Sequence, residues 1–299
     1  MTTDRELTAM RRGIALSAFG LGTTSPNPPV GCVILDTGGR IVGEGYHRRK
    51  GEPHAEVNAL RAAGERARGG TAVVTLEPCN HHGRTPPCRQ ALIDAGISRV
   101  LVAVLDPTSR EEGGAARLRA AGLDVETEVL ADETRVVLRP WLHALSVGRP
   151  HVHVTYALTE SRYTELDATG LATMRSAVDA VVLPDGQIEE GVRDGHAPDV
   201  FSLPPSFDSE NSVAALTDLY QRGVRSVLLV GHAPALLEER LVDELTVYLS
   251  QQRASQVQDA STAAALIPCG FYCESVVRTP DHVQLVLRDD ASASEAEKR

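Results

Sequence analysis

The sequence lacks features that would assign it to several common functional classes. No dense run of Lys and Arg occurs in its 299 residues, the net charge is −10, and the nearest basic cluster is HRRK at 47–50. Polyanion binding normally shows itself as a basic stripe or patch, so nucleic acid is a poor candidate partner. A small anionic substrate remains compatible, because one or two Arg side chains are enough to bind a phosphate.

Long apolar runs are also absent. No stretch reaches the roughly eighteen apolar residues of a membrane-spanning helix. The polar N-terminus, MTTDRELTAMRRG, lacks the apolar segment of a signal peptide. Cysteine is scarce, odd in number and scattered, which disfavours a disulfide framework and favours a cytoplasmic protein with thiols free to bind metal. The five cysteines are Cys32, Cys79, Cys88, Cys269 and Cys273.

The first half of the chain alternates helical and strand patterns. Apolar residues recur at helical spacing from Leu7 to Leu21, and three more helices are predicted further on. The first two of five predicted strands are joined by the turn sequence DTGG. This alternation predicts an α/β domain over residues 1–147, with helices layered on a mixed sheet. The other predicted helices cover 55–66, 88–95 and 115–121, and the predicted strands cover 30–35, 41–46, 71–76, 99–105 and 125–129.

A second α/β unit is predicted over residues 148–290, after a seam at LSVGRP (145–150). Its strand-like segments are HVHVTYAL (151–158), DAVVL (179–183), SVLLV (226–230) and LTVYL (245–249). The Gly-, Pro- and Asp-rich passage from Asp185 to Asn211 predicts a long loop. Cys269 and Cys273, in PCGFYC, are expected in a buried strand or loop rather than as a second metal pair. The polar tail, 291–299, is predicted to be disordered.

The segment LEPCNHHGRTPPC (76–88) has the composition of a metal site. One interpretation is a structural zinc site using Cys79, Cys88 and either His81 or His82. Structural sites, however, need four protein ligands, usually in pairs about two to four residues apart, and the two cysteines are separated by eight residues. A second interpretation adds the upstream sequence PHAEV, which supplies His54 and a glutamate two residues later. Zinc deaminases carry that His-x-Glu pair, then Pro-Cys, then a second Cys.

The second interpretation explains the residue types. Two thiolates and one imidazole leave one tetrahedral position free for water, whose pKa the metal lowers towards neutrality. Glu56 is then placed to move protons from that water to an amino-bearing ring and to the departing ammonia. Amide donors near Cys79 and Cys88 are expected to stabilise the thiolates. His81 and His82 are left as loop residues that do not bind the metal.

Five segments occurring in order carry a resemblance to a known family. They are TSPNPPVGCVI, GEGYH, PHAEVNAL, TLEPCNHHGRTPPC and VLDP. Together, over about residues 7–145, they resemble the deaminase domain of the bifunctional riboflavin-biosynthesis deaminase/reductase family. The resemblance implies a cytidine-deaminase-like three-layer α/β/α domain, followed by a dihydrofolate-reductase-like α/β domain that is shortened here. It also implies hydrolytic deamination of 2,5-diamino-6-(5-phosphoribosylamino)pyrimidin-4-one to 5-amino-6-(5-phosphoribosylamino)uracil and ammonia.

The same resemblance implies roles for individual residues. One Zn²⁺ per chain would be held by His54, Cys79 and Cys88, with Glu56 as the proton shuttle. The implied substrate contacts are Asn27, His47, Arg84, Asp106 and Thr108, with Arg84 facing the ribose phosphate. Thr108 stands where the family has an Asn. The resemblance further implies a homodimer or higher homo-oligomer acting on a small phosphorylated pyrimidine, with neither nucleic acid nor membrane as a partner.

The second half has lost the reductase markers of that family. Thr155 occupies the position of a lysine, Pro184 that of a glycine, Val230 that of a glutamate and His232 that of another glycine. LVDEL (241–245), which resembles a packing segment, persists. We therefore expect no NADPH cofactor and an inactive, degenerate reductase domain that serves as a scaffold, a dimerisation surface or a lid.

Four alternatives stay open at the level of sequence. The same deaminase chemistry could serve a specialised metabolite that branches from the riboflavin pathway, or the chain could be an active bifunctional deaminase/NADPH reductase. A nucleic-acid editing deaminase is disfavoured by the acidic composition and by the long spacing between the two cysteines. A zinc-stabilised scaffold without enzymatic activity is the fourth alternative.

Overall fold

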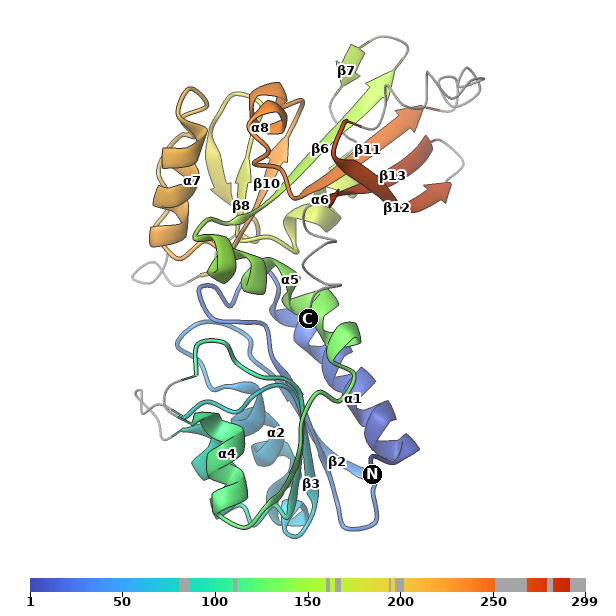
Figure 1. Ribbon diagram of the computed structural model, residues 1–299, viewed down its shortest axis with the longest axis vertical. Coiled ribbons are helices and arrows are strands. Elements are labelled where there is room, and N and C mark those ends of the chain that lie inside the picture. Colours follow the sequence, from blue (N-terminus) through green and yellow to red (C-terminus); the bar gives the residue numbers. More distant parts are fainter. Residues whose placement is uncertain are drawn as a thin grey trace. The chain divides into compact units, whose positions relative to one another are not determined.

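The computed structural model describes residues 1–80, 87–109, 112–159, 162–164, 168–193, 195–196, 202–250, 268–278 and 282–290. The chain divides into two units, Met1–Arg139 and Pro140–Arg299, each of which is described by itself (Figure 1). The division falls inside helix α5 (Ala131–Val147), which contains Pro140 and ends at the first residues of the predicted seam.

The first unit is built on a five-stranded sheet with the order β2-β1-β3-β4-β5. Strand β1 (Gly31–Leu35) pairs antiparallel with both β2 (Ile41–Tyr46) and β3 (Thr71–Leu76). Strands β4 (Arg99–Val104) and β5 (Asp124–Glu126) continue the sheet in parallel with β3. The mixed sheet and the hairpin predicted at DTGG are confirmed.

Helices cover both faces of this sheet. A Cβ added at Gly31 would lie 2.0 Å from the Gly13 carbonyl oxygen of α1, and one added at Gly45 would lie 2.5 Å from the Ala59 nitrogen of α2. Because Gly45 is registered with Cys32, the neighbour of Gly31, the two helices lie on opposite faces of the sheet. The predicted three layers are therefore present (Figure 1). The helices are α1 (Asp4–Ser17), α2 (Ala55–Ala63), α3 (Cys88–Asp94) and α4 (Gly113–Ala120), with 3₁₀ turns at Ala18–Gly20 and Gly64–Ala67.

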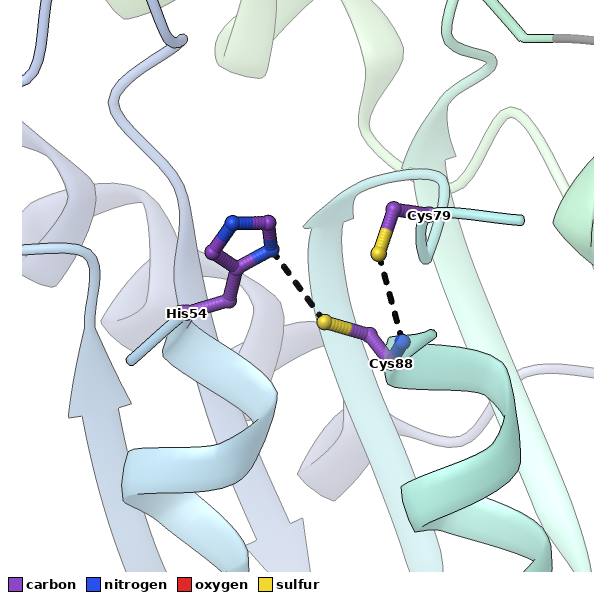
Figure 2. A group of neighbouring side chains, drawn as sticks. All are labelled: His54, Cys79 and Cys88. Carbon is purple, nitrogen blue, oxygen red and sulfur yellow. Dashed lines mark hydrogen bonds between the residues drawn. The ribbon is translucent and has the colours of Figure 1, made fainter. Parts of the chain in front are cut away.

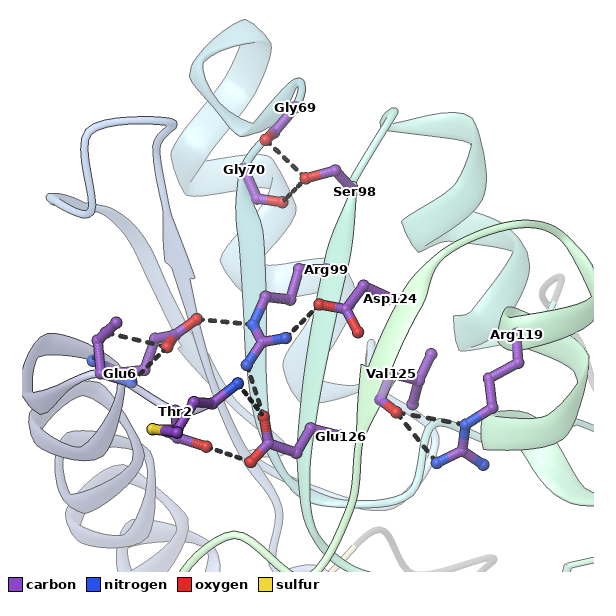
Figure 3. Close-up of polar contacts among 12 residues, drawn as sticks. Thr2, Glu6, Gly69, Gly70, Ser98, Arg99, Arg119, Asp124, Val125 and Glu126 are labelled. Carbon is purple, nitrogen blue, oxygen red and sulfur yellow. Dashed lines mark hydrogen bonds and ion pairs between the residues drawn. The ribbon is translucent and has the colours of Figure 1, made fainter.

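A charged network ties α1 to the start of β4 and to β5. The Arg99 side chain, 18% exposed, pairs with Glu6 of α1 at 2.9 Å, with Glu126 at 2.6 Å and with Asp124 (Figure 3). Burial alone would lower the pKa of Arg99, but its hydrogen bonds to the three carboxylates outweigh burial and raise that pKa. Arg99 opens β4, so this network lies at the opposite end of the parallel strands from the loops that follow β3 and β4, and we assign it a structural role.

The second unit contains an eight-stranded sheet with the order β12-β13-β11-β6-β10-β8-β9, and β7 pairs with β6. Its four central strands are mutually parallel, as expected for a layered α/β domain. They are β8 (Ala180–Val182), β10 (Ser226–Val230), β6 (His151–Thr159) and β11 (Glu244–Ser250). The antiparallel strands are β7 (Arg162–Thr164), β9 (Ile188–Glu190), β12 (Phe271–Arg278) and β13 (His282–Asp289).

Two apolar clusters lie on this sheet. The larger contains Leu216 and Leu219 of α7 (Ser212–Gln221) and Leu236 of α8 (Pro234–Glu238). The smaller cluster packs against Leu171 and Met174 of α6 (Ala168–Arg175).

Two expectations for the second unit are wrong. The passage from Asp185 to Asn211 is not loop throughout, because it contains β9, which pairs with β8. Cys269 and Cys273 are exposed rather than buried, since β12 carries exposed side chains along most of its length. The prediction for the tail, 291–299, falls outside the described residues. Within the parts of the chain that are described, no helix combines the length and apolarity needed to cross a membrane.

Candidate metal centre

Three potential ligands reach one place from three different elements. His54 is the N-cap residue of α2, with extended backbone angles (φ −68°, ψ 167°) and no capping bond from its side chain. Cys79 follows the end of β3 by three residues, and Cys88 is the first residue of α3. The centre therefore lies at the carboxyl end of β3, where ligand sites of open parallel α/β sheets are usually found.

The ligand atoms of His54, Cys79 and Cys88 all lie within 4.8 Å of one another (Figure 2). The Cys88 sulfur is 3.2 Å from His54 Nδ1, and the Cys88 main-chain N–H donates to the Cys79 sulfur at 3.2 Å. Among the described residues, no further His, Cys, Asp or Glu belongs to the group. One imidazole and two thiols suit Zn²⁺, and three protein ligands are the number found in catalytic rather than structural zinc sites.

The surroundings favour a thiolate at Cys79. Hydrogen bonds from the Cys88 thiol, His54 and the Cys88 main chain outweigh burial and lower the pKa of Cys79 to about 4. The hydrogen bond between the Cys88 thiol and the Cys79 sulfur, followed by burial, raises the pKa of Cys88. The pKa values of the two thiols are therefore shifted in opposite directions, and Cys79 is the one that ionises more readily. A thiolate is the form of cysteine that binds metal.

Glu56 lies in the first turn of α2, two residues after His54, and is only 3% exposed. Burial raises the pKa of its carboxyl group to about 6, although the charge of His54 acts in the opposite direction. A carboxyl group with such a pKa can both accept and release a proton near neutral pH. Cys32, across on β1, is fully buried, and burial followed by the charge of Glu56 raises the pKa of its thiol.

Two of the predicted substrate contacts lie near the metal ligands: His47 lies beside His54, and Asn27 lies beside His47. The ring of His47 is centred 5.0 Å from that of His54, in an edge-on arrangement. Asn27 Nδ2 is 3.2 Å from His47 Nε2, and His47 Nδ1 is 3.4 Å from the Pro53 carbonyl oxygen. Burial, followed by the charge of His54, lowers the pKa of His47 to about 4. A neutral ring that accepts from Asn27 and donates to Pro53 satisfies both contacts.

Asp106 and Thr108 form a local turn after β4. The Oδ1 atom of Asp106 accepts from the main-chain N–H of Thr108 at 2.8 Å and from its hydroxyl at 2.7 Å. The turn-forming role that the sequence suggested for this segment is therefore present, and Thr108 is exposed. His81, His82 and Arg84 lie outside the described residues.

Glu77 is a buried residue that the sequence analysis did not single out. It lies two residues before Cys79, is 7% exposed, and accepts hydrogen bonds from residues 106, 109 and 115. The only signal available in the sequence was a carboxylate directly after an apolar strand. Its partners are 29 to 38 residues further along the chain, so local spacing could not identify them.

With this geometry established, comparison with known proteins places the chain among the zinc-binding deaminases. Residues 3–104 match the family described as the cytidine and deoxycytidylate deaminase zinc-binding region. More narrowly, the chain belongs to the diaminohydroxyphosphoribosylaminopyrimidine deaminase family of riboflavin biosynthesis. The fold class and family predicted from the sequence are thus confirmed.

Relatives of two lengths support that assignment. The diaminohydroxyphosphoribosylamino-pyrimidine deaminase of Buchnera aphidicola subsp. Schizaphis graminum is 47% identical over 142 residues, which are 47% of this chain and 96% of that protein. The riboflavin biosynthesis protein RibD of Escherichia coli is 51% identical over 146 residues, 48% of this chain. This second match spans only 40% of the E. coli protein's length.

Several solved structures are similar over nearly the whole chain. A diaminohydroxyphosphoribosylaminopyrimidine deaminase/5-amino-6-(5-phosphoribosylamino)uracil reductase from Thermotoga maritima has a TM-score of 0.76 and 27% sequence identity. The similarity covers 95% of this chain and 99% of that one, so it includes elements of both units.

Proposed function

We propose that the chain is a zinc-dependent aminohydrolase that converts 2,5-diamino-6-(5-phosphoribosylamino)pyrimidin-4-one to 5-amino-6-(5-phosphoribosylamino)uracil and ammonia. The observation that carries the proposal is the convergence of His54, Cys79 and Cys88 within 4.8 Å, with Glu56 buried beside them. The choice of substrate is supported by the Buchnera relative, which is named a deaminase of this pyrimidine and matches 47% of this chain.

The side chains divide the chemistry between them. The reaction replaces the 2-amino group with an oxygen from water, so one C–N bond breaks while a C–O bond forms. Zinc bound by His54, Cys79 and Cys88 would act as a Lewis acid that activates the water. Glu56, whose raised pKa suits a proton carrier, would carry the two protons of that water in turn, one to a ring nitrogen and one to the departing amino group, which leaves as ammonia.

Substrate binding is assigned to residues around the carboxyl end of β3. His47 lies next to His54, and Asn27 lies next to His47, which supports a role for both in contacting the pyrimidine. The turn of Asp106 and Thr108 follows β4, whose last residue is registered with the last residue of β3. By resemblance, Arg84 would bind the ribose phosphate, where an Arg guanidinium can make two parallel hydrogen bonds.

For the second unit, which we propose to begin at residue 148, we propose a degenerate reductase domain that does not use NADPH. Of the four positions that differ from the reductase pattern, Thr155 and Val230 are buried and engaged in packing, whereas Pro184 and His232 are exposed. The Thr155 hydroxyl donates to the Thr246 carbonyl oxygen at 3.3 Å, Val230 is 8% exposed, and His232 lies edge-on to Tyr156 at 5.6 Å. These contacts support a scaffold role. An active NADPH reductase, the alternative, would need these positions to face a cofactor.

One incubation tests both proposals. The purified chain is given the diaminopyrimidinone phosphate with and without NADPH, and the products are followed by mass spectrometry. We expect the aminouracil phosphate and ammonia in both reactions, with no consumption of NADPH. Absence of ammonia would refute the deaminase, whereas a reduced ribitylamino product would refute the inactive reductase and favour the bifunctional alternative.

Complementation separates the two pathway alternatives. Expression in a deaminase-deficient riboflavin auxotroph should restore growth if the chain serves riboflavin synthesis. Failure to restore growth, together with ammonia release in vitro, would favour a specialised metabolite made from the same pyrimidine. We further propose that the chain is cytoplasmic, because reduced thiols are needed at the metal centre. By resemblance to the family, we propose a homodimer or higher homo-oligomer. Size-exclusion chromatography with light scattering tests the oligomeric state.

A further inference from the structure

We propose that Glu77 is a positioning residue for substrate recognition, which holds the loop after β4 in place relative to the metal ligand Cys79. The inference rests on the proposed deaminase function, since that loop carries Asp106 and Thr108. Glu77 itself is buried and has no assigned contact with the reacting atoms. Its proposed effect therefore passes through the loop that it binds.

The main chain fixes Glu77 at the junction between two strands and two loops. Its N–H donates to the Val104 carbonyl oxygen at 2.9 Å, extending the β3–β4 pairing by one step. From there the chain continues through Pro78 to Cys79. Any displacement of the Glu77 main chain is therefore transmitted to a metal ligand two residues away.

Three donors converge on the Glu77 carboxylate. Oε2 accepts from the main-chain N–H of Asp106 at 3.2 Å and from the Ser109 hydroxyl at 2.9 Å. Oε1 accepts from the main-chain N–H of Ala115, in the first turn of α4, at 2.8 Å. One side chain thus binds both ends of the connection between β4 and α4.

The start of α4 is packed directly onto Glu77 and Pro78. A Cβ added at Gly114 would lie 1.9 Å from the Pro78 carbonyl oxygen. A Cβ added at Gly113, whose φ is +79°, would lie 2.6 Å from Glu77 Oε1. Main chain therefore contacts main chain here, and only glycine fits this close approach. The start of α4 is thus packed closely enough on Glu77 for the carboxylate to reach the Ala115 amide.

The arrangement requires a carboxylate rather than merely a polar side chain. An ionised carboxylate only accepts hydrogen bonds and has enough lone pairs for three donors. A glutamine has the same shape, but its NH₂ group would face an N–H or O–H donor on one side. Glu77→Gln should therefore loosen the loop while leaving the volume of the side chain unchanged.

The test is steady-state kinetics of Glu77→Gln with the diaminopyrimidinone phosphate. We expect zinc content to stay at one per chain, kcat to stay within about threefold, and KM to rise about tenfold, the size expected when one buried hydrogen bond is lost. Glu65→Gln is the matched control, since it makes the same charge change at an exposed position outside the site. An unchanged KM in the folded variant, or loss of zinc together with kcat, would overturn the proposal.

A second variant, Ser109→Ala, tests the same contact without changing Glu77. A second measurement, hydrogen exchange, tests the anchoring of the loop without any substrate. Ser109→Ala removes one donor without touching the carboxylate. It should raise KM by a smaller factor, and it should add nothing in the Glu77→Gln background. Hydrogen exchange at the Asp106 and Ala115 amides should speed up in Glu77→Gln but not in Glu65→Gln. If the wild-type chain does not deaminate the substrate, the proposed function fails while hydrogen exchange still decides whether Glu77 anchors the loop.

Discussion

Glu56 and Glu77 are both buried glutamates near Cys79, but their surroundings give them different roles. The Glu77 oxygens accept from two donors in the loop after β4 and one in the first turn of α4, so this carboxylate is a fixed acceptor. Burial dominates the environment of Glu56 and raises its pKa to about 6. Proton transfer needs a group that can change its charge near neutral pH, and this requirement selects Glu56.

Glu56→Gln should abolish turnover without releasing the metal. The amide cannot carry a proton between water and substrate, so we expect kcat to fall about 10²- to 10⁴-fold. Zinc should remain at one per chain, because Glu56 is not among the three converging ligands. Steady-state assays with metal analysis by mass spectrometry check both statements, and Glu65→Gln again serves as the control. Unaltered kcat would remove Glu56 from the mechanism.

Residues that belong to motifs of characteristic sequence spacing could be predicted from the sequence. His54, Glu56 and the two cysteines follow a pattern that hydrolytic zinc chemistry requires, and the structure brings the three ligands together. Glu77 could not be predicted in this way. Its partners are two main-chain amides and one hydroxyl, and only the fold brings these groups to it.

At the scale of elements, the contact between β2 and α2 determines where His54 and Glu56 lie. A Cβ at Gly45 would approach the Ala59 nitrogen to 2.5 Å and the Ala55 carbonyl oxygen to 2.6 Å. The helix backbone therefore lies directly against the strand. This close approach fixes the height of the N-terminus of α2 above the sheet, and with it the position of the metal ligand.

Gly45→Ala should push α2 away from the sheet and disturb the metal centre. We expect a loss of about 1–3 kcal/mol in the free energy of unfolding, typical of overpacking, together with weaker zinc binding. Gly13→Ala is the matched control on α1, where the nearest atom to an added Cβ is Thr75 Cγ2 at an ordinary 3.4 Å. Thermal unfolding and zinc titration check the pair. Equal behaviour of the two variants would contradict the prediction.

Most elements of the first unit and the four parallel strands of the second could be predicted from the pattern of their apolar residues, whereas the antiparallel strands of the second unit were not. Strand β9 has only three residues, too few for alternation to be visible. Cys273, expected in a buried strand or loop, lies in β12, whose only neighbour among the described strands is β13. Burial at the edge of a sheet depends on what lies next to it, which the local sequence does not encode.

At the scale of the molecule, each unit has its own sheet, and the second unit is held at the start of β6 by a buried charge. Asp243 accepts from Arg149 at 2.6 Å and from the main-chain N–H of Val152 at 2.8 Å, and His143 lies 3.1 Å away. Burial alone would raise the pKa of Asp243, but the bonds from His143 and Arg149 outweigh it and lower that pKa. This carboxylate therefore stabilises the unit above its ordinary pKa and ceases to do so only in strong acid.

His151 should make the second unit sensitive to mild acid. Burial outweighs the charge of Asp243 and lowers the pKa of His151 to about 4, whereas an unfolded histidine titrates near 6.5. As pH falls from about 6.5 to 4, the unfolded chain binds a proton that the folded chain does not, so the free energy of unfolding falls by about 3 kcal/mol. Asp243 adds its own loss only at still lower pH.

Urea unfolding at pH 7, 5.5 and 4.5 measures this effect. The transition is followed by the fluorescence of Trp141, which is the only tryptophan of the sequence and belongs to the second unit. His151→Gln cannot bind the proton, so its midpoint should fall less between pH 7 and 4.5 than that of the wild type. His282→Gln, at a half-buried histidine of the same unit, should keep the wild-type slope. If His151→Gln loses as much stability as the wild type over this range, another group controls the acid sensitivity of this unit.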